Sequence, residues 1–103
     1  MEIEILVVPD CPNEKLAADR LRQALDDVGL PEVGFTVRVV ADQAEAERIG
    51  FTGSPTICVE GRDPFAEAGR APGLVCRVYR TPEGLAGAPG LDDLRQMLRP
   101  SAG

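Results

Sequence analysis

The chain has 103 residues, of which 44% are apolar and 27% charged, and its formal net charge is −6, from 17 acidic and 11 basic side chains. This length and composition predict one ordinary globular domain with a single packed core. The acidic balance argues against nucleic acids and anionic membranes as partners, because both are polyanions. Histidine is absent, which removes the commonest general base and the commonest metal ligand.

The N-terminus and the cysteines bear on location and on cofactors. The chain opens with Glu2 and Glu4 rather than a basic region, and no apolar run approaches the roughly 20 residues of a membrane span. We therefore expect a cytoplasmic protein without a signal peptide, in which thiols stay reduced. The cysteines, at positions 11, 58 and 76, match neither a disulfide framework nor a zinc ligand pattern, so the sequence predicts no metal and no resident cofactor.

Residues 2–8 predict the first strand, because they alternate at the start and then become continuously apolar, as in a strand that ends buried on both faces. Residues 12–28 predict a helix, since apolar side chains recur there every three or four positions. Pro12 suits the first helical position, which makes Cys11 the cap residue, and Gly29 ends the helix.

Two more strands and a short helix are predicted in the middle of the chain. Residues 35–40 alternate apolar with polar side chains, as in a half-buried edge strand. Asp42 and Glu45 are typical of a capping box, and the short helix that follows them ends at Gly50. Residues 56–59 are a short apolar run that predicts the third strand.

The last third of the chain alternates between loops and regular elements. Residues 61–73 and 81–90 are rich in Gly and Pro and predict loops. Between them, residues 74–80 predict a fourth strand. Residues 91–98 predict a last helix with a buried apolar face, and residues 101–103 predict a frayed tail.

The order of these elements is strand, helix, strand, helix, strand, strand, helix. Helices join the first three strands, which predicts parallel pairing with right-handed crossovers, and a loop joins the last two, which predicts an antiparallel pair. The expected fold class is α/β, with one domain over residues 1–100. Its four-stranded mixed sheet would have the strand order 2-1-3-4 and helices on both faces.

The expected position of Cys11 points to a reactive thiol. A sulfur at a helix N-terminus meets free N–H groups and the positive end of the helix dipole, and both favour the reactive thiolate. The carboxylate of Asp10 would oppose this effect if it lies close, and the ammonium of Lys15 would support it.

A second segment completes a resemblance to the thioredoxin-like superfamily. A strand leads to Cys11-Pro12, and residues 50–56 read Gly-Phe-Thr-Gly-Ser-Pro-Thr, which resembles the Gly-Val-x-Gly-x-Pro-Thr segment of thioredoxins. The resemblance implies a thioredoxin-like fold in which Pro55 is cis and packs against Cys11. The Ser54 backbone would offer strand-like hydrogen bonds to a bound thiol or peptide.

In these terms Cys11 is the candidate catalytic residue, and the binding residues are Pro12, Ser54, Pro55 and Thr56. The redox motif of the family is Cys-x-x-Cys, but here Glu14 replaces the second cysteine. Turnover in thioredoxins needs that second thiol to attack the mixed disulfide. The motif therefore supports a glutaredoxin-like monothiol mechanism, with a low-molecular-weight thiol as co-substrate.

A more extensive resemblance is to small thioredoxin-family proteins of actinobacterial type that are often labelled alkylmercury lyases. It covers residues 9–13, 50–56, 63–65 and 76–79. Some similar sequences look like selenoproteins with selenocysteine at the position of Cys11. The resemblance favours a redox or soft-metal role for that thiol. In a lyase, Asp10 or Glu14 would supply the proton to carbon.

The other two cysteines have simpler interpretations. Cys58 lies in an apolar strand and is best interpreted as core filler. Cys76 is predicted to lie in the neighbouring strand, where it could be a cross-strand neighbour of Cys58. A Cys58–Cys76 disulfide is disfavoured in a reducing compartment. A role for Cys76 as the resolving thiol of Cys11 is weaker still, because a mid-strand residue should lie well away from the first helix.

Three further features have structural interpretations beside the functional ones. Cys11 itself can be an inert surface thiol. Arg77 and Arg80 are expected to be solvated. Residues 63–65, Asp-Pro-Phe, form either a docking loop or a loop-closing turn with Phe65 in the core.

The sequence therefore supports three hypotheses of different classes. The first is a cytosolic monothiol thioredoxin-like protein, an oxidoreductase that forms a transient disulfide through Cys11 with a thiol or disulfide substrate, either protein or small molecule. The second is a non-catalytic binding module of the same fold, with Pro55 and the loops as its interaction surface. The third is the binding or detoxification of soft metals such as mercury through Cys11.

Overall fold

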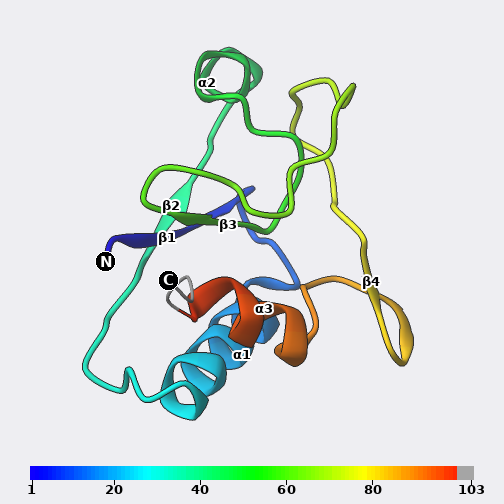
Figure 1. The fold of residues 1–103 in the computed structure, drawn as a ribbon. Coiled ribbons are helices and arrows are strands. Elements are labelled where there is room, and N and C mark those ends of the chain that lie inside the picture. The colour runs from blue at the N-terminus through cyan, green and yellow to red at the C-terminus, as the bar shows by residue number, and fades with distance from the viewer. Residues whose placement is uncertain (100–103) are drawn as a thin grey trace.

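The centre of the fold is strand β1 (Ile3–Val7), which pairs on both sides in the computed structural model, described here for residues 1–99 (Figure 1). Strand β2 (Thr36–Val39) pairs parallel with it, and strand β3 (Thr56–Val59) pairs antiparallel. The sheet is therefore mixed, with the order β2-β1-β3. The expected tail at residues 101–103 lies outside the described residues.

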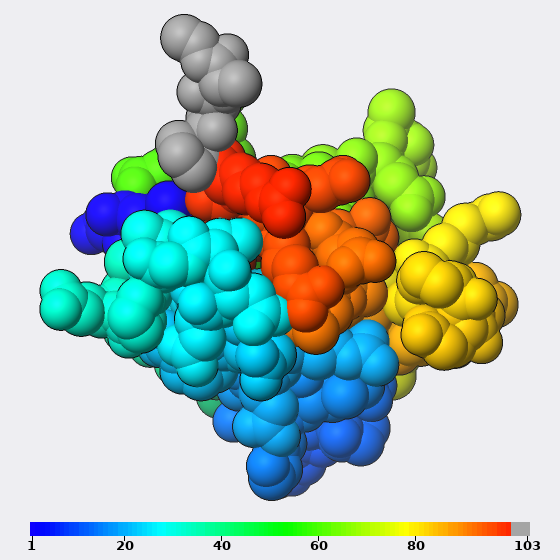
Figure 2. Space-filling view, turned by 60° about the horizontal axis from the view of Figure 1, so that its bottom comes forward, coloured from blue at the N-terminus to red at the C-terminus, as the bar shows by residue number. Residues whose placement is uncertain are grey.

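Helices α1 (Glu14–Asp27) and α3 (Leu91–Leu98) pack against each other on one face of this sheet (Figure 1). Figure 2 shows both helices on one side of the molecule. The apolar periodicity predicted both of them within two residues at each end, and Gly29, with φ +81°, follows the end of α1 as expected. The core on this face comprises Ile3, Ile5, Val7, Ala17, Leu21, Ala24, Leu25, Ile57, Ala88, Leu94 and Leu98.

Helix α2 (Gln43–Ile49) lies on the other side of the sheet from α1 and α3 (Figure 1). Ala46 packs there with Leu6, Val40 and Phe51 in a smaller apolar cluster. The Asp42 carboxylate caps this helix by accepting from the Glu45 N–H at 2.8 Å. Helices thus contact both faces of the sheet. Within residues 1–99, no helix is long and apolar enough to cross a membrane.

The expected parallel pairing of the first and third strands is wrong. The last residue of β2, Val39, lies beside Val7, and the first residue of β3, Thr56, lies beside Leu6. The chain between them therefore returns to the end of the sheet where β2 stopped, and β3 must run back. A helix between two strands does not by itself require a crossover to the opposite end of the sheet. Helix α2 packs near the end of the sheet at which β2 stops, beside Leu6 and Val40.

The expected fourth strand of the sheet is also wrong. Of the residues expected in that strand, 74–80, only the last two are in a strand. They belong to β4 (Tyr79–Thr81), which pairs with β5 (Gly84–Ala86) in a separate two-stranded hairpin. The Tyr79 hydroxyl donates to the carbonyl of Pro55 at 2.6 Å. Further back in the expected strand, Cys76 forms only an isolated parallel bridge with Ser54, so residues 74–80 add no strand to the three-stranded sheet.

Strand β2 is an edge strand, as its sequence predicts, but its exposed face is the opposite of the one expected. Val37 and Val39 are 42% and 49% exposed, although the alternating pattern predicts them to be buried. The side chain that lies closer to the protein is Arg38, whose guanidinium contacts the Glu45 carboxylate at 2.7 Å. Arg38 lies on the face of the sheet that α2 covers, which the alternating pattern assigned to solvent, and forms its ion pair there.

Candidate functional site

A hydrogen bond joins Cys11 to Ser54, which lies 43 residues further along the chain. The Ser54 hydroxyl donates to the Cys11 sulfur at 2.9 Å and accepts from the Val8 N–H at 3.0 Å. Ser54 is fully buried, whereas Cys11 is partly exposed. Because the hydroxyl oxygen is held by Val8, its hydrogen points to the sulfur, and an anionic sulfur accepts such a bond more strongly than a neutral one.

Cys11 does not occupy the cap position that the sequence predicts. Helix α1 begins at Glu14, and its N-cap is Asn13. The chain turns at Asp10, which has a positive φ of 57°, and the Cys11 carbonyl then accepts from the Glu14 N–H at 3.3 Å. Residues 10–13 therefore form a turn ahead of the helix. The main partner of the sulfur is the Ser54 hydroxyl rather than the first turn of the helix.

The Ser54–Pro55 peptide bond is cis, as the resemblance implies. The Ser54 backbone, however, is not free to bind a ligand. Its N–H donates to the Val75 carbonyl at 2.8 Å, and its carbonyl accepts from the Arg77 N–H at 2.9 Å. The expectation that this backbone would pair with a bound peptide is therefore wrong, because residues 75–77 of the same chain already occupy both groups.

The remaining predicted site residues divide between exposed and structural positions. Pro12, next to Cys11, is exposed, and so is Asp10. The Lys15 ammonium contacts the Asp19 carboxylate at 2.7 Å, so it pairs along the helix rather than with the sulfur. Thr56 is buried, and its hydroxyl donates to the Gly53 carbonyl at 2.6 Å. Within residues 1–99, the only side-chain hydrogen bond to the Cys11 sulfur comes from Ser54.

Arg77 is a structural residue that the sequence interpretation missed. It is 3% exposed, and its guanidinium contacts the Asp63 carboxylate at 2.7 Å and the Thr56 hydroxyl at 3.2 Å. It also donates to the Phe65 carbonyl and lies 4.8 Å above the centre of the Tyr79 ring. Opposite charge, hydrogen bonds and an aromatic face together compensate for burying a cation.

The signal that would have found Arg77 is the period of two along residues 74–80. That period puts Arg77 on the same side as Tyr79, which is buried, whereas Arg80 lies on the other side and is exposed, as expected. The Asp63-Pro64-Phe65 segment is a loop-closing turn, in which the Asp63 carboxylate accepts from the Phe65 N–H at 2.9 Å. The Phe65 ring packs edge-on against Tyr79, with centroids 5.8 Å apart.

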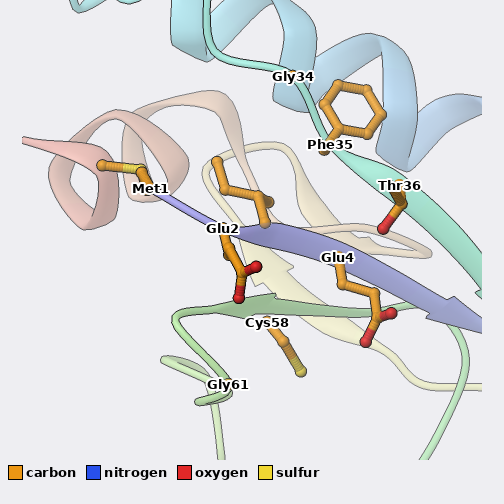
Figure 3. Close-up of a pocket in the computed structure, with 9 residues that line it drawn as sticks. Met1, Glu2, Glu4, Gly34, Phe35, Thr36, Cys58 and Gly61 are labelled. Atoms are coloured by element: carbon orange, nitrogen blue, oxygen red, sulfur yellow. The ribbon is translucent and has the colours of Figure 1, made fainter.

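Cys58 lines an open groove of about 510 Å³ (Figure 3). It is half-buried and packs against the apolar cluster around Ala46, and its pairing partner in strand β1 is Glu4. Figure 3 shows both side chains extending from the same side of the sheet. Burial, and then the nearby charges of Asp63 and Glu4, raise the pKa of the Cys58 thiol to about 11. The thiol is therefore protonated near neutral pH.

We expect Cys58 to be the slowest of the three cysteines to react with iodoacetamide at neutral pH, because only the thiolate attacks. Its labelling should accelerate as the pH approaches 11. Mass spectrometry of peptides after timed labelling at several pH values measures this for each cysteine. Labelling of Cys58 at pH 7 as fast as that of free cysteine would contradict the raised pKa.

Cys76 is exposed and lies beside Ser54, with which it forms a parallel bridge. The expectation that it would be a cross-strand neighbour of Cys58 is wrong, because Cys58 pairs across the sheet with Glu4. Cys76 was expected to lie well away from the first helix, but it adjoins Ser54, the residue that binds the Cys11 sulfur. All three cysteines are free thiols.

In residues 1–99, no group of three or more His, Cys, Asp or Glu side chains is placed to hold a metal ion. No protein-family model, no curated protein and no solved structure matches this chain.

Proposed function

We propose that this chain is a thioredoxin-like protein that carries out thiol–disulfide exchange, and that it forms transient mixed disulfides through Cys11. The observation that carries the proposal is the hydrogen bond of 2.9 Å from the hydroxyl of the buried Ser54 to the sulfur of Cys11, a partly exposed residue. A fixed hydrogen-bond donor to the sulfur of a partly exposed cysteine is a feature of nucleophilic cysteines. The proposal suits a reducing cytoplasm, where the free thiol is maintained.

The reaction would be a direct exchange at sulfur. The Cys11 thiolate attacks one sulfur of a substrate disulfide, a new disulfide joins Cys11 to that half, and the other half leaves as a thiolate. Glu14 stands where the thioredoxin motif has its second cysteine. Release of the bound half therefore needs another thiol, for which a low-molecular-weight thiol is the simplest candidate.

The surroundings of Cys76 favour a substrate with an apolar part, such as a protein disulfide. Leu74, Val75 and Val78 all lie exposed in the segment that runs beside Ser54. Exposed apolar side chains grouped near a reactive group are typical of surfaces that contact another protein. Such a contact would bring a substrate disulfide to the sulfur of Cys11.

Replacing Cys11 with serine is expected to slow the consumption of oxidised glutathione by at least about tenfold. Within residues 1–99 no other thiol has a buried hydroxyl donor, and a charge-assisted hydrogen bond contributes more than about 1.4 kcal/mol. The release of reduced glutathione measures the rate. Cys58→Ser is the matched control and should react like the wild type. Equal rates for wild type and Cys11→Ser would exclude Cys11 as the nucleophile.

A further inference from the structure

We propose that Cys76 is the resolving thiol of Cys11, so that the chain completes its exchange reaction through an intramolecular Cys11–Cys76 disulfide. The inference rests on the proposed function and assigns the step that Glu14 cannot perform. It is carried by the position of Cys76 beside Ser54, the residue that binds the Cys11 sulfur.

Both cysteines adjoin Ser54. Ser54 donates from its N–H to the Val75 carbonyl and accepts at its carbonyl from the Arg77 N–H. These two bonds are the pattern of a parallel strand pair centred on Ser54 and Cys76, whose backbones are then about 4.8 Å apart. The Ser54 hydroxyl is 2.9 Å from the Cys11 sulfur.

The direction of the Cys76 side chain follows from its neighbours. Residues paired in adjacent strands point to the same side, so Cys76 points to the side of the Ser54 hydroxyl, where Cys11 lies. Arg77 must then point to the opposite side. It does, because a Cβ added to Gly53 would lie 2.8 Å from the Arg77 Cβ, on the buried side where Arg77 meets Asp63. Cys76 itself is exposed and free to react.

The step balances without a further oxidant. In the mixed disulfide, Cys11 is bonded to one half of the substrate disulfide. The Cys76 thiolate attacks the Cys11 sulfur, the Cys11–substrate bond breaks, and the bound half leaves as a thiolate. The substrate disulfide has then been reduced to two thiols, and Cys11 and Cys76 have been oxidised to one disulfide. A low-molecular-weight thiol of the cell would reduce that disulfide and return the protein to its free thiols.

The test compares the wild type with Cys76→Ser and with Cys58→Ser as matched control, each given a limiting amount of oxidised glutathione. Non-reducing mass spectrometry of peptides follows the products. For the wild type and Cys58→Ser we expect release of both glutathione halves and a peptide linked through Cys11 and Cys76. For Cys76→Ser we expect the reaction to stop at glutathione bound to Cys11, and this adduct should last at least about ten times longer, because an intramolecular thiol acts at high effective concentration.

Each outcome has a distinct meaning. An adduct on Cys11 of equal lifetime in the wild type and in Cys76→Ser, with no linked peptide, would overturn the resolving role and leave the proposed function standing. Loss of the linked peptide in Cys58→Ser would overturn it too, since Cys58 would then be required. If neither the wild type nor Cys76→Ser consumes oxidised glutathione, the proposed function itself fails.

Discussion

Replacing Arg77 with alanine is expected to lower the free energy of unfolding by about 3 kcal/mol. The Arg77 guanidinium is buried and pairs with Asp63 at 2.7 Å, and the Asp63 side chain is only 18% exposed. The alanine variant would leave that carboxylate without its cation in a partly desolvated position. Deleting one partner of a buried ion pair costs about 3–5 kcal/mol, and the residual exposure of Asp63 places this case at the lower end.

The loss should also loosen the thiol site. Arg77 connects the Thr56 hydroxyl, the Phe65 carbonyl and the Tyr79 ring, and its N–H donates to the Ser54 carbonyl. It therefore holds the segment of residues 75–77 against Ser54. Without its side chain, this segment loses its anchor in the core and keeps only its backbone bonds to Ser54.

Denaturant unfolding followed by circular dichroism measures the effect, and the melting temperature should fall by more than about 10 °C. Arg80→Ala is the matched control. Arg80 is exposed, so its removal should change the stability by no more than about 0.5 kcal/mol. Equal stability of the two variants would show that the Arg77–Asp63 pair contributes nothing to the folded state.

Replacing Gly53 with alanine is expected to destabilise the fold by roughly 2–4 kcal/mol. Two effects add at this residue. Its φ of +152° is a backbone conformation that residues with a side chain rarely adopt. In addition, the new methyl group would lie 2.8 Å from the Arg77 Cβ and 3.4 Å from the Arg77 Cα, so the backbone of one segment must move away from the other.

Gly50→Ala separates these two effects. Gly50 has a positive φ of 73° but no heavy atom within 4 Å of an added Cβ, so this control measures the backbone cost alone, roughly 1 kcal/mol. Unfolding curves of both variants give the difference, which is the cost of crowding Arg77. If Gly53→Ala is no less stable than Gly50→Ala, the close packing of residues 53 and 77 is contradicted.

The two halves of the thiol site could be predicted from local patterns. An apolar run that ends at a Pro-Asp-Cys turn and a Gly-Ser-Pro-Thr segment before a short strand marked each half, and the resemblance to thioredoxins implied that the two meet; Ser54 does bind the Cys11 sulfur. The role of the Ser54 hydroxyl was not predictable in the same way. Its hydrogen bonds join atoms from three separate segments, and no spacing along the chain encodes that arrangement.

The sequence by itself determined where the helices and strand β1 lie, because apolar periodicity, Gly29 and the Asp42 cap act within a few residues. Only the tertiary structure decided that β3 runs antiparallel to β1, and that residues 74–78 lie beside Ser54 instead of forming a fourth strand of the sheet. Strand direction depends on the end of the sheet to which a connection returns. The path of the later segment depends on where the long side chains of Arg77 and Tyr79 find partners, and those partners are distant in the chain.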